Sequence, residues 1–194
     1  MQKFNKPIVK KVGNYLFIGL LLLLVFNPAA KAWLLRQFMN VGLFKAGMKK
    51  EAVVNQNQAP AQHFVFRDVN GVASSTAELE GKVVFINFWA TWCPPCVAEM
   101  PGMNAMYKQL RGDERFVFLF INEDEDPEKA KEFLQKKGFV MPLFTRAGNA
   151  PSGIYSGTLP TTVVLDKTGK VVFKHEGFAN YDNSEFIAQL KALL

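Results

Sequence analysis

The stretch of residues 82–101, K-V-V-F-I-N-F-W-A-T-W-C-P-P-C-V-A-E-M-P, decides the fold. Residues 82–90 form a dense run of β-branched and aromatic side chains, which is typical of a central, buried strand. Residues 94–110 have the composition of a helix, and Pro101 inside them predicts a kink. The stretch therefore predicts a strand that leads directly into a helix, with Cys93 and Cys96 at the junction.

These two cysteines, the only ones in the chain, are placed to act as one redox pair. Positions i and i+3 of a helix face the same way, so the two sulfurs can meet. The positive end of the helix favours the thiolate, which makes Cys93 the expected nucleophile. Its thiolate would attack a substrate disulfide, and Cys96 would then attack Cys93 and release the reduced substrate. Pro94 and Pro95 have no N–H, so the backbone N–H of Cys96 and its S–H are the main donors left for the Cys93 sulfur.

The rest of the chain predicts alternating strands and helices around this junction. Asn70-Gly71 indicates a hairpin, and Asp126 followed by Pro127 is typical of a helix start. The further expected elements are strands at 116–121, 161–165 and 170–174, and helices at 127–137 and 184–194. The order is β-hairpin, βαβα, β-hairpin and α, which predicts an α/β sandwich with a mixed sheet.

Composition and charge exclude several classes of protein. Two cysteines are too few for a small disulfide framework or a structural zinc site. Nine of the 23 basic residues and none of the 17 acidic ones lie in residues 1–50, so residues 51–194 hold 14 basic and 17 acidic side chains. The net charge of +6 therefore comes from the N-terminal segment, and nucleic-acid binding is not expected.

The N-terminal segment has the pattern of a membrane anchor or an export signal. Four lysines precede twelve uninterrupted apolar residues, 15–26, and Ala30-Lys31-Ala32 has the form of a signal-peptidase site. Residues 33–44 predict an amphipathic helix with a tryptophan, which favours an uncleaved anchor, and residues 51–62 are typical of a linker. The expected organisation is a membrane anchor or signal at 1–32, an amphipathic segment and linker at 33–62, and a globular domain at 63–194 outside the cytosol.

A strand followed by W-C-x-x-C and a helix with an internal proline resembles the thioredoxin superfamily. The pattern C-x-x-C-x-x-E-x-P, formed by Cys93, Cys96, Glu99 and Pro101 behind an N-terminal membrane segment, is similar to its TlpA/ResA-like branch. The resemblance covers about residues 60–194. It implies a thioredoxin-like sandwich whose redox-active disulfide, Cys93–Cys96, serves without another cofactor. It also implies a reductant of exported proteins, in several members the apocytochromes c, supplied with electrons by a membrane thiol donor.

The resemblance also assigns the proton chemistry. Asn87 lies where the best-known thioredoxins have a buried aspartate that accepts a proton, and an amide cannot accept that proton. Glu99 is the candidate replacement, since its charge would raise the pKa values of the thiols and it could take the proton of Cys96. The alternative for Glu99 is an ordinary surface glutamate in an early helical turn.

The expected substrate-binding residues surround the disulfide in this family. A cis-proline is implied at Pro160, which would turn the backbone of Leu159 toward a substrate for strand-like pairing. Trp92 is either a lid over the sulfurs or part of the core. The substrate-binding set is therefore Trp92, Pro94, Pro95, Leu159 and Pro160.

Other functions fit the residues less well. His175 with the two thiolates could hold copper, as in thioredoxin-like assembly chaperones, although those resemble C-x-x-x-C. The acidic run 123–126 is expected to be a solvated helix cap, so no metal site is predicted. A peroxiredoxin pattern fails at Ile86 and Ala90. A disulfide oxidase or isomerase with the same cysteines stays open, because direction depends on redox potential and partners.

Overall fold

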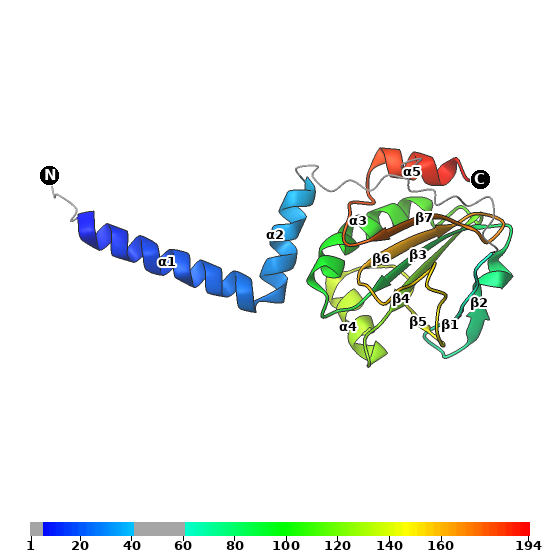
Figure 1. Ribbon diagram of the computed structural model, residues 1–194, viewed down its shortest axis with the longest axis horizontal. Coiled ribbons are helices and arrows are strands. Elements are labelled where there is room, and N and C mark those ends of the chain that lie inside the picture. Colours follow the sequence, from blue (N-terminus) through cyan, green and yellow to red (C-terminus); the bar gives the residue numbers. More distant parts are fainter. Residues whose placement is uncertain (1–5, 41–60) are drawn as a thin grey trace.

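The computed structural model of the protein describes residues 6–40 and 61–194. Its centre is a seven-stranded mixed sheet in the order β2-β1-β5-β4-β3-β6-β7 (Figure 1). The β3–β4 and β4–β5 pairs are parallel, and the other pairs are antiparallel. The strands are β1 (Val65–Arg67), β2 (Ala73–Ser75), β3 (Val83–Trp89), β4 (Phe116–Asn122), β5 (Phe144–Arg146), β6 (Thr161–Leu165) and β7 (Val171–Glu176).

The helices of the domain are α3 (Pro94–Leu110), α4 (Pro127–Lys137) and α5 (Ser184–Lys191), with a short 3-10 turn, η1 (Thr76–Leu79). The predicted α/β sandwich and its mixed sheet are confirmed, and the predicted helices at 94–110 and 127–137 have the predicted bounds. Asp126 caps α4 as expected, because its carboxylate accepts the N–H of Glu128 at 3.1 Å. The sequence prediction lacked β5, whose three residues are too few to show a strand period.

Strand β3 is buried along its whole length and separates two apolar clusters. Successive side chains of a strand point to opposite faces, so Val83, Phe85 and Trp89 face the helices while Val84, Ile86 and Phe88 face the other way. The first cluster includes methionines of α3 and Phe186 of α5. The second cluster includes Phe64 and Ile154, which come from outside the strands. Asn87 lies on the helix side of the strand, where it meets α3.

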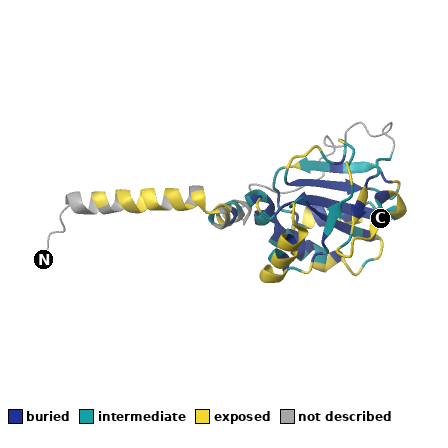
Figure 2. Ribbon diagram, turned by 90° about the horizontal axis from the view of Figure 1, so that it is seen from below, coloured by how far each residue is buried: buried dark blue, intermediate teal, exposed yellow. Residues whose placement is uncertain are grey.

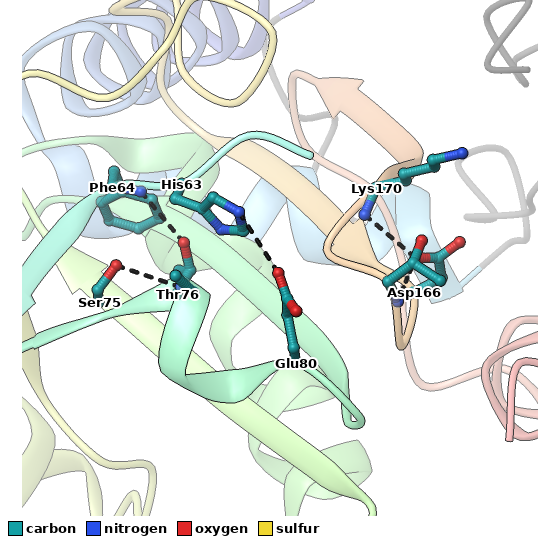
Figure 3. A network of polar contacts seen from close by, with 9 residues as sticks. His63, Phe64, Ser75, Thr76, Glu80, Asp166 and Lys170 are labelled. Atoms are coloured by element: carbon teal, nitrogen blue, oxygen red, sulfur yellow. Dashed lines mark hydrogen bonds and ion pairs between the residues drawn. The ribbon is translucent and has the colours of Figure 1, made fainter. Parts of the chain in front are cut away.

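The segment that enters the domain is held at the start of β3, the end opposite to the cysteines. Figure 3 shows these contacts: the N–H of Phe64 donates to the hydroxyl of Thr76 at 3.1 Å, and the His63 imidazole lies 3.6 Å from the Glu80 carboxylate. In the same view the Asp166 carboxylate accepts the N–H of Lys170 at 3.1 Å and so closes the β6–β7 turn. The domain is predicted to begin at His63, and His63 and Phe64 make contacts that hold this segment against the domain.

Two helices precede the domain, α1 (Lys6–Phe26) and α2 (Pro28–Asn40). Figures 1 and 2 show α1 projecting away from the domain and α2 lying against α3. Ala32 of α2 is buried against Ala98 of α3, with Leu35, Val97 and Phe178 packed around them. Within residues 6–40 and 61–194, no helix is long and apolar enough to cross a membrane. The predicted boundary after residue 32 falls inside α2, and most of the predicted linker lies outside the described residues.

Candidate redox site

The two cysteines lie where β3 passes into α3. Cys93 is the N-cap residue of the helix, and its sulfur accepts the backbone N–H of Cys96 at 3.3 Å. The two sulfurs form a disulfide with an S–S distance of 2.06 Å and a Cα–Cα distance of 5.3 Å. The prolines between them occupy the first two helical positions, where no intrahelical N–H is required. The local sequence thus starts the helix and closes the disulfide with the same four residues.

An open pocket of about 640 Å³ leads to the disulfide. Most of the predicted substrate-binding residues line it together with Cys93, namely Trp92, Pro94, Pro95 and Leu159. The side chain of Trp92 is 65% exposed, so the core alternative for this residue is wrong. Trp92 instead forms part of the pocket wall next to Cys93.

The peptide bond between Leu159 and Pro160 is cis, as the resemblance implied. Pro160 is buried directly before β6, and its carbonyl oxygen accepts the N–H of Gly177 at 2.9 Å. Strand β6 lies beside β3, the strand that leads to the cysteines. Leu159, just before β6, therefore lies on the wall of the same pocket.

Glu99 is buried on α3, one turn after Cys96 and on the same side of the helix. Its side chain is 2% exposed, so the surface alternative is wrong. One carboxyl oxygen accepts the Asn87 side-chain N–H at 3.0 Å, and the other accepts the backbone N–H of Ala179 at 3.1 Å. Burial raises the pKa of the Glu99 carboxyl well above its ordinary value, although both hydrogen bonds act in the opposite direction.

The pocket also contains residues that the sequence prediction did not select as site residues. Glu123 and Tyr155 line it, and Arg146 of β5 forms a bidentate ion pair with Glu123 at 3.0 and 2.8 Å. The Arg146 guanidinium lies over the Tyr155 ring, 5.5 Å from its centroid, and that ring stacks on Phe88. The prediction of a solvated helix cap for the acidic run 123–126 holds for Asp126, which caps α4, but not for Glu123, which lines the pocket. Glu123 was missed because its partner comes from β5, the strand that the sequence did not reveal.

His175 does not form a metal site with the two cysteines in the described residues. In the described part of the chain, no group of three or more His, Cys, Asp or Glu side chains could hold a metal ion. His175 is instead the register partner of Thr162 in the β6–β7 ladder and stacks on Phe173.

A family model described as Redoxin matches residues 54–190, which include the cysteine pair, the cis-proline and the buried glutamate. The chain belongs to the Redoxin family. "Thiol-disulfide oxidoreductase ResA" of Bacillus thuringiensis (strain Al Hakam) is 33% identical over 160 residues, which cover 82% of this chain and 86% of that protein. The protein of the same name from Geobacillus thermodenitrificans is 37% identical over 126 residues, 63% of this chain and 70% of that one.

Solved structures agree with this family. A thiol:disulfide interchange protein of the thioredoxin family from Chlorobium tepidum TLS has a TM-score of 0.55 and 30% identity, covering 70% of this chain and 97% of that one. The exposed lipoprotein thioredoxin Etrx1 of Streptococcus pneumoniae strain TIGR4 has a TM-score of 0.55 at 24% identity over 67% of this chain and 98% of its own, and shares the fold. This Redoxin-family protein is thus a thiol-disulfide oxidoreductase with a thioredoxin-like fold, and Cys93 and Cys96 form its disulfide.

Proposed function

We propose that this Redoxin-family protein reduces disulfide bonds of exported proteins outside the cytosol. The observation that carries the proposal is the Cys93–Cys96 disulfide at the start of α3, on the wall of an open pocket and one helical turn before a buried carboxyl group. The pocket supplies access for a folded or unfolded substrate chain, and the carboxyl group supplies a proton acceptor.

The reaction begins from the dithiol form of the protein. The Cys93 thiolate attacks one sulfur of a substrate disulfide, which forms a mixed disulfide and releases the first substrate thiolate. Cys96 gives its proton to the Glu99 carboxylate and attacks the Cys93 sulfur. The Cys93–Cys96 disulfide forms and the second substrate thiolate leaves. It takes up the proton that Glu99 received, which returns Glu99 to the carboxylate, and the first substrate thiolate takes a proton from solvent. Two electrons pass to the substrate, and an external dithiol donor restores the two protein thiols.

Leu159, Trp92 and the two active-site prolines are the proposed substrate contacts. The backbone of Leu159 would pair with an extended substrate segment, because it borders the pocket directly before the cis-proline. The exposed ring of Trp92 would cover the mixed disulfide from the other wall and limit the access of water.

The proposed partners are exported proteins with disulfides, among them apocytochromes c, and a membrane dithiol that supplies electrons. The N-terminal segment would hold the protein at a membrane, since α1 presents exposed apolar side chains such as Tyr15, Leu16 and Phe26. The burial of Ala32 against α3 supports retention of this segment, because cleavage after Ala32 would remove it from its contact. Fractionation of native cells should find the full-length chain with the membranes, and a soluble form beginning at Trp33 would overturn the anchor.

Trapping of the mixed disulfide tests the reductase activity. In a Cys96→Ser variant, Cys93 can attack a substrate but the adduct cannot be resolved. We expect exported proteins to be isolated as disulfide adducts of Cys93 from native cells, and a Cys93→Ser control to yield none. The proposal fails if no adduct forms while the purified wild type binds copper stoichiometrically through Cys93 and Cys96.

Titration of the Cys93 thiol tests the role of Glu99. The negative charge of Glu99 disfavours a second negative charge on the sulfurs, so Glu99→Gln should lower the pKa of Cys93. Thiolate absorbance of the reduced protein, followed against pH, provides the measurement. An unchanged thiol pKa would leave Glu99 without a role in the chemistry.

A further inference from the structure

Asn87 stands at the inner end of a polar row that crosses three strands. It is the register partner of Thr162 on β6, which is in turn the partner of His175 on β7. The amide nitrogen of Asn87 donates to a Glu99 carboxyl oxygen and to the Thr162 hydroxyl, both at 3.0 Å. Asn87 and Thr162 are 0% and 1% exposed, so solvent does not supply alternative partners for this set.

The ionised and the neutral form of Glu99 require different hydrogen bonds from Asn87. Both carboxyl oxygens accept an N–H, from Asn87 and from Ala179, which is the arrangement that an ionised carboxylate requires. Burial favours the neutral acid, and a neutral acid carries an O–H that requires an acceptor. The side-chain oxygen of Asn87 is itself buried and has no hydrogen-bond partner among the described residues.

We propose that Asn87 is a positioning residue that serves Glu99 in both protonation states. Its amide nitrogen donates to the carboxylate, and after a half-turn of the amide its oxygen accepts the O–H of the carboxylic acid. The Thr162 hydroxyl can follow this change because it both accepts and donates hydrogen bonds. The inference rests on the proposed role of Glu99, since a proton acceptor in a redox cycle must be held in both states.

The other titratable groups around Glu99 do not replace this function. Cys93 and Cys96 precede Glu99 on α3, and His175 lies two strands away from Asn87 in the same row. Tyr181 is buried close by, where desolvation and the negative charge of Glu99 raise the pKa of its phenol, so this side chain stays neutral. Asn87 is the side chain that donates a hydrogen bond to the carboxyl group, and the other donor is the backbone N–H of Ala179.

Infrared titration of reduced full-length protein tests the proposal directly. The carboxylic C=O band that disappears in Glu99→Gln reports the protonation of Glu99. Asn87→Leu keeps a similar volume but removes the hydrogen bond to Glu99 in both protonation states. The bond to the charged carboxylate is the stronger of the two, so we expect the Glu99 pKa to rise by about one unit. An unchanged Glu99 titration in Asn87→Leu would overturn the proposal.

Asn87→Asp provides a second variant of nearly the same shape, in case the leucine is not tolerated. Two adjacent carboxyl groups share a proton, so Glu99 and the new aspartate should titrate in two separate steps. Titration of Glu99 in one step at the wild-type pH would contradict the contact. The matched control is Asn104→Leu, another buried asparagine, which accepts the N–H of Val140. A comparable shift in this control would overturn the proposal, because it would show a general effect of losing a buried amide.

The thiol titration separates this inference from the role of Glu99 itself. If Asn87 acts through Glu99, Asn87→Leu should change the pKa of Cys93 in the wild type and produce no further change in Glu99→Gln. A shift of Cys93 by Asn87→Leu in the Glu99→Gln background would overturn the inference. A shift of the Glu99 band without any shift of Cys93 would support the positioning role while contradicting the proton-acceptor role of Glu99.

Discussion

At the residue scale, the buried carboxyl of Glu99 is both a functional group and a cost to stability. Its two hydrogen bonds compensate only part of the desolvation of the charge, so the folded protein retains a proton that the unfolded chain releases. Because the unfolded state then binds fewer protons, the free energy of unfolding falls as the pH rises above the ordinary glutamate pKa of about 4.3. The fall ends once the pH passes the raised pKa in the folded state.

Glu99→Gln should therefore stabilise the protein in a pH-dependent manner. At pH 7 we expect the free energy of unfolding to rise by about 1 kcal/mol or more relative to the wild type, and the gain to shrink toward pH 4. Urea unfolding at several pH values measures the difference. The exposed Glu132→Gln on α4 serves as the control and should show no such trend. A Glu99→Gln gain that is equal at pH 4 and pH 7 would contradict the raised pKa.

The chemistry-bearing residues of the site were predictable because they are local in sequence. Cys93, Cys96 and Glu99 lie within seven consecutive positions, and helical spacing alone places them on one side of α3. The burial of Glu99 was not predictable in the same way. It depends on Ala179, which lies 80 residues further along the chain. The Glu123–Arg146 pair escaped prediction for the same reason, since 23 residues separate its members.

At the element scale, each boundary near the site is fixed by a residue with a specific backbone role. The two prolines start α3, Asp126 starts α4, and Gly138 ends α4 in the left-handed region with φ at 66°. The N–H of Gly138 donates to the carbonyl of Gln135 at 3.0 Å and so satisfies the end of the helix. These signals depend on single residues, which is why the bounds of α3 and α4 could be predicted from the sequence. Strand β5 lacks such signals and forms only because β1 and β4 lie on either side of it.

Gly138→Ala should destabilise the protein by about 1 kcal/mol. A Cβ atom in the left-handed region lies too close to the following carbonyl oxygen, and glycine avoids that contact. Urea unfolding provides the measurement, and Gly112→Ala is the matched control. Gly112 has no positive φ and no atom within 4 Å of the added Cβ, so its substitution should change the free energy of unfolding by less than about 0.5 kcal/mol. Equal losses at both positions would contradict the backbone role of Gly138.

At the scale of the whole molecule, α2 connects the N-terminal segment to the helix that carries the redox site. Ala32 packs on Ala98, which immediately precedes Glu99, and Phe178 in the same cluster precedes the residue whose N–H binds Glu99. The docked α2 therefore covers the side of α3 behind the buried carboxyl group. The pattern of residues 33–44 predicts an amphipathic helix here but not its contact surface, because a short apolar pattern does not specify a partner.

Ala32→Asp should detach α2 from the domain. An unpaired carboxylate buried against Ala98 costs several kcal/mol, which exceeds what this small contact can offset. We expect limited proteolysis between α2 and the domain to become about tenfold faster or more. Gln37→Asp introduces the same charge at an exposed position of α2 and should cleave at the wild-type rate. Equal cleavage of the two variants would show that α2 does not depend on Ala32 for its docking.

The exposed ring of Trp92 beside Cys93 has an optical consequence. A disulfide quenches the fluorescence of a neighbouring indole, whereas two separate thiols quench it less. Trp33 lies on α2, whereas Trp89 is buried in the same cluster as the two cysteines, so the emission that changes with reduction of Cys93–Cys96 should come from Trp92 and Trp89. The protein thus carries its own fluorescent reporter, with which the rate of each half of its cycle can be followed without a label.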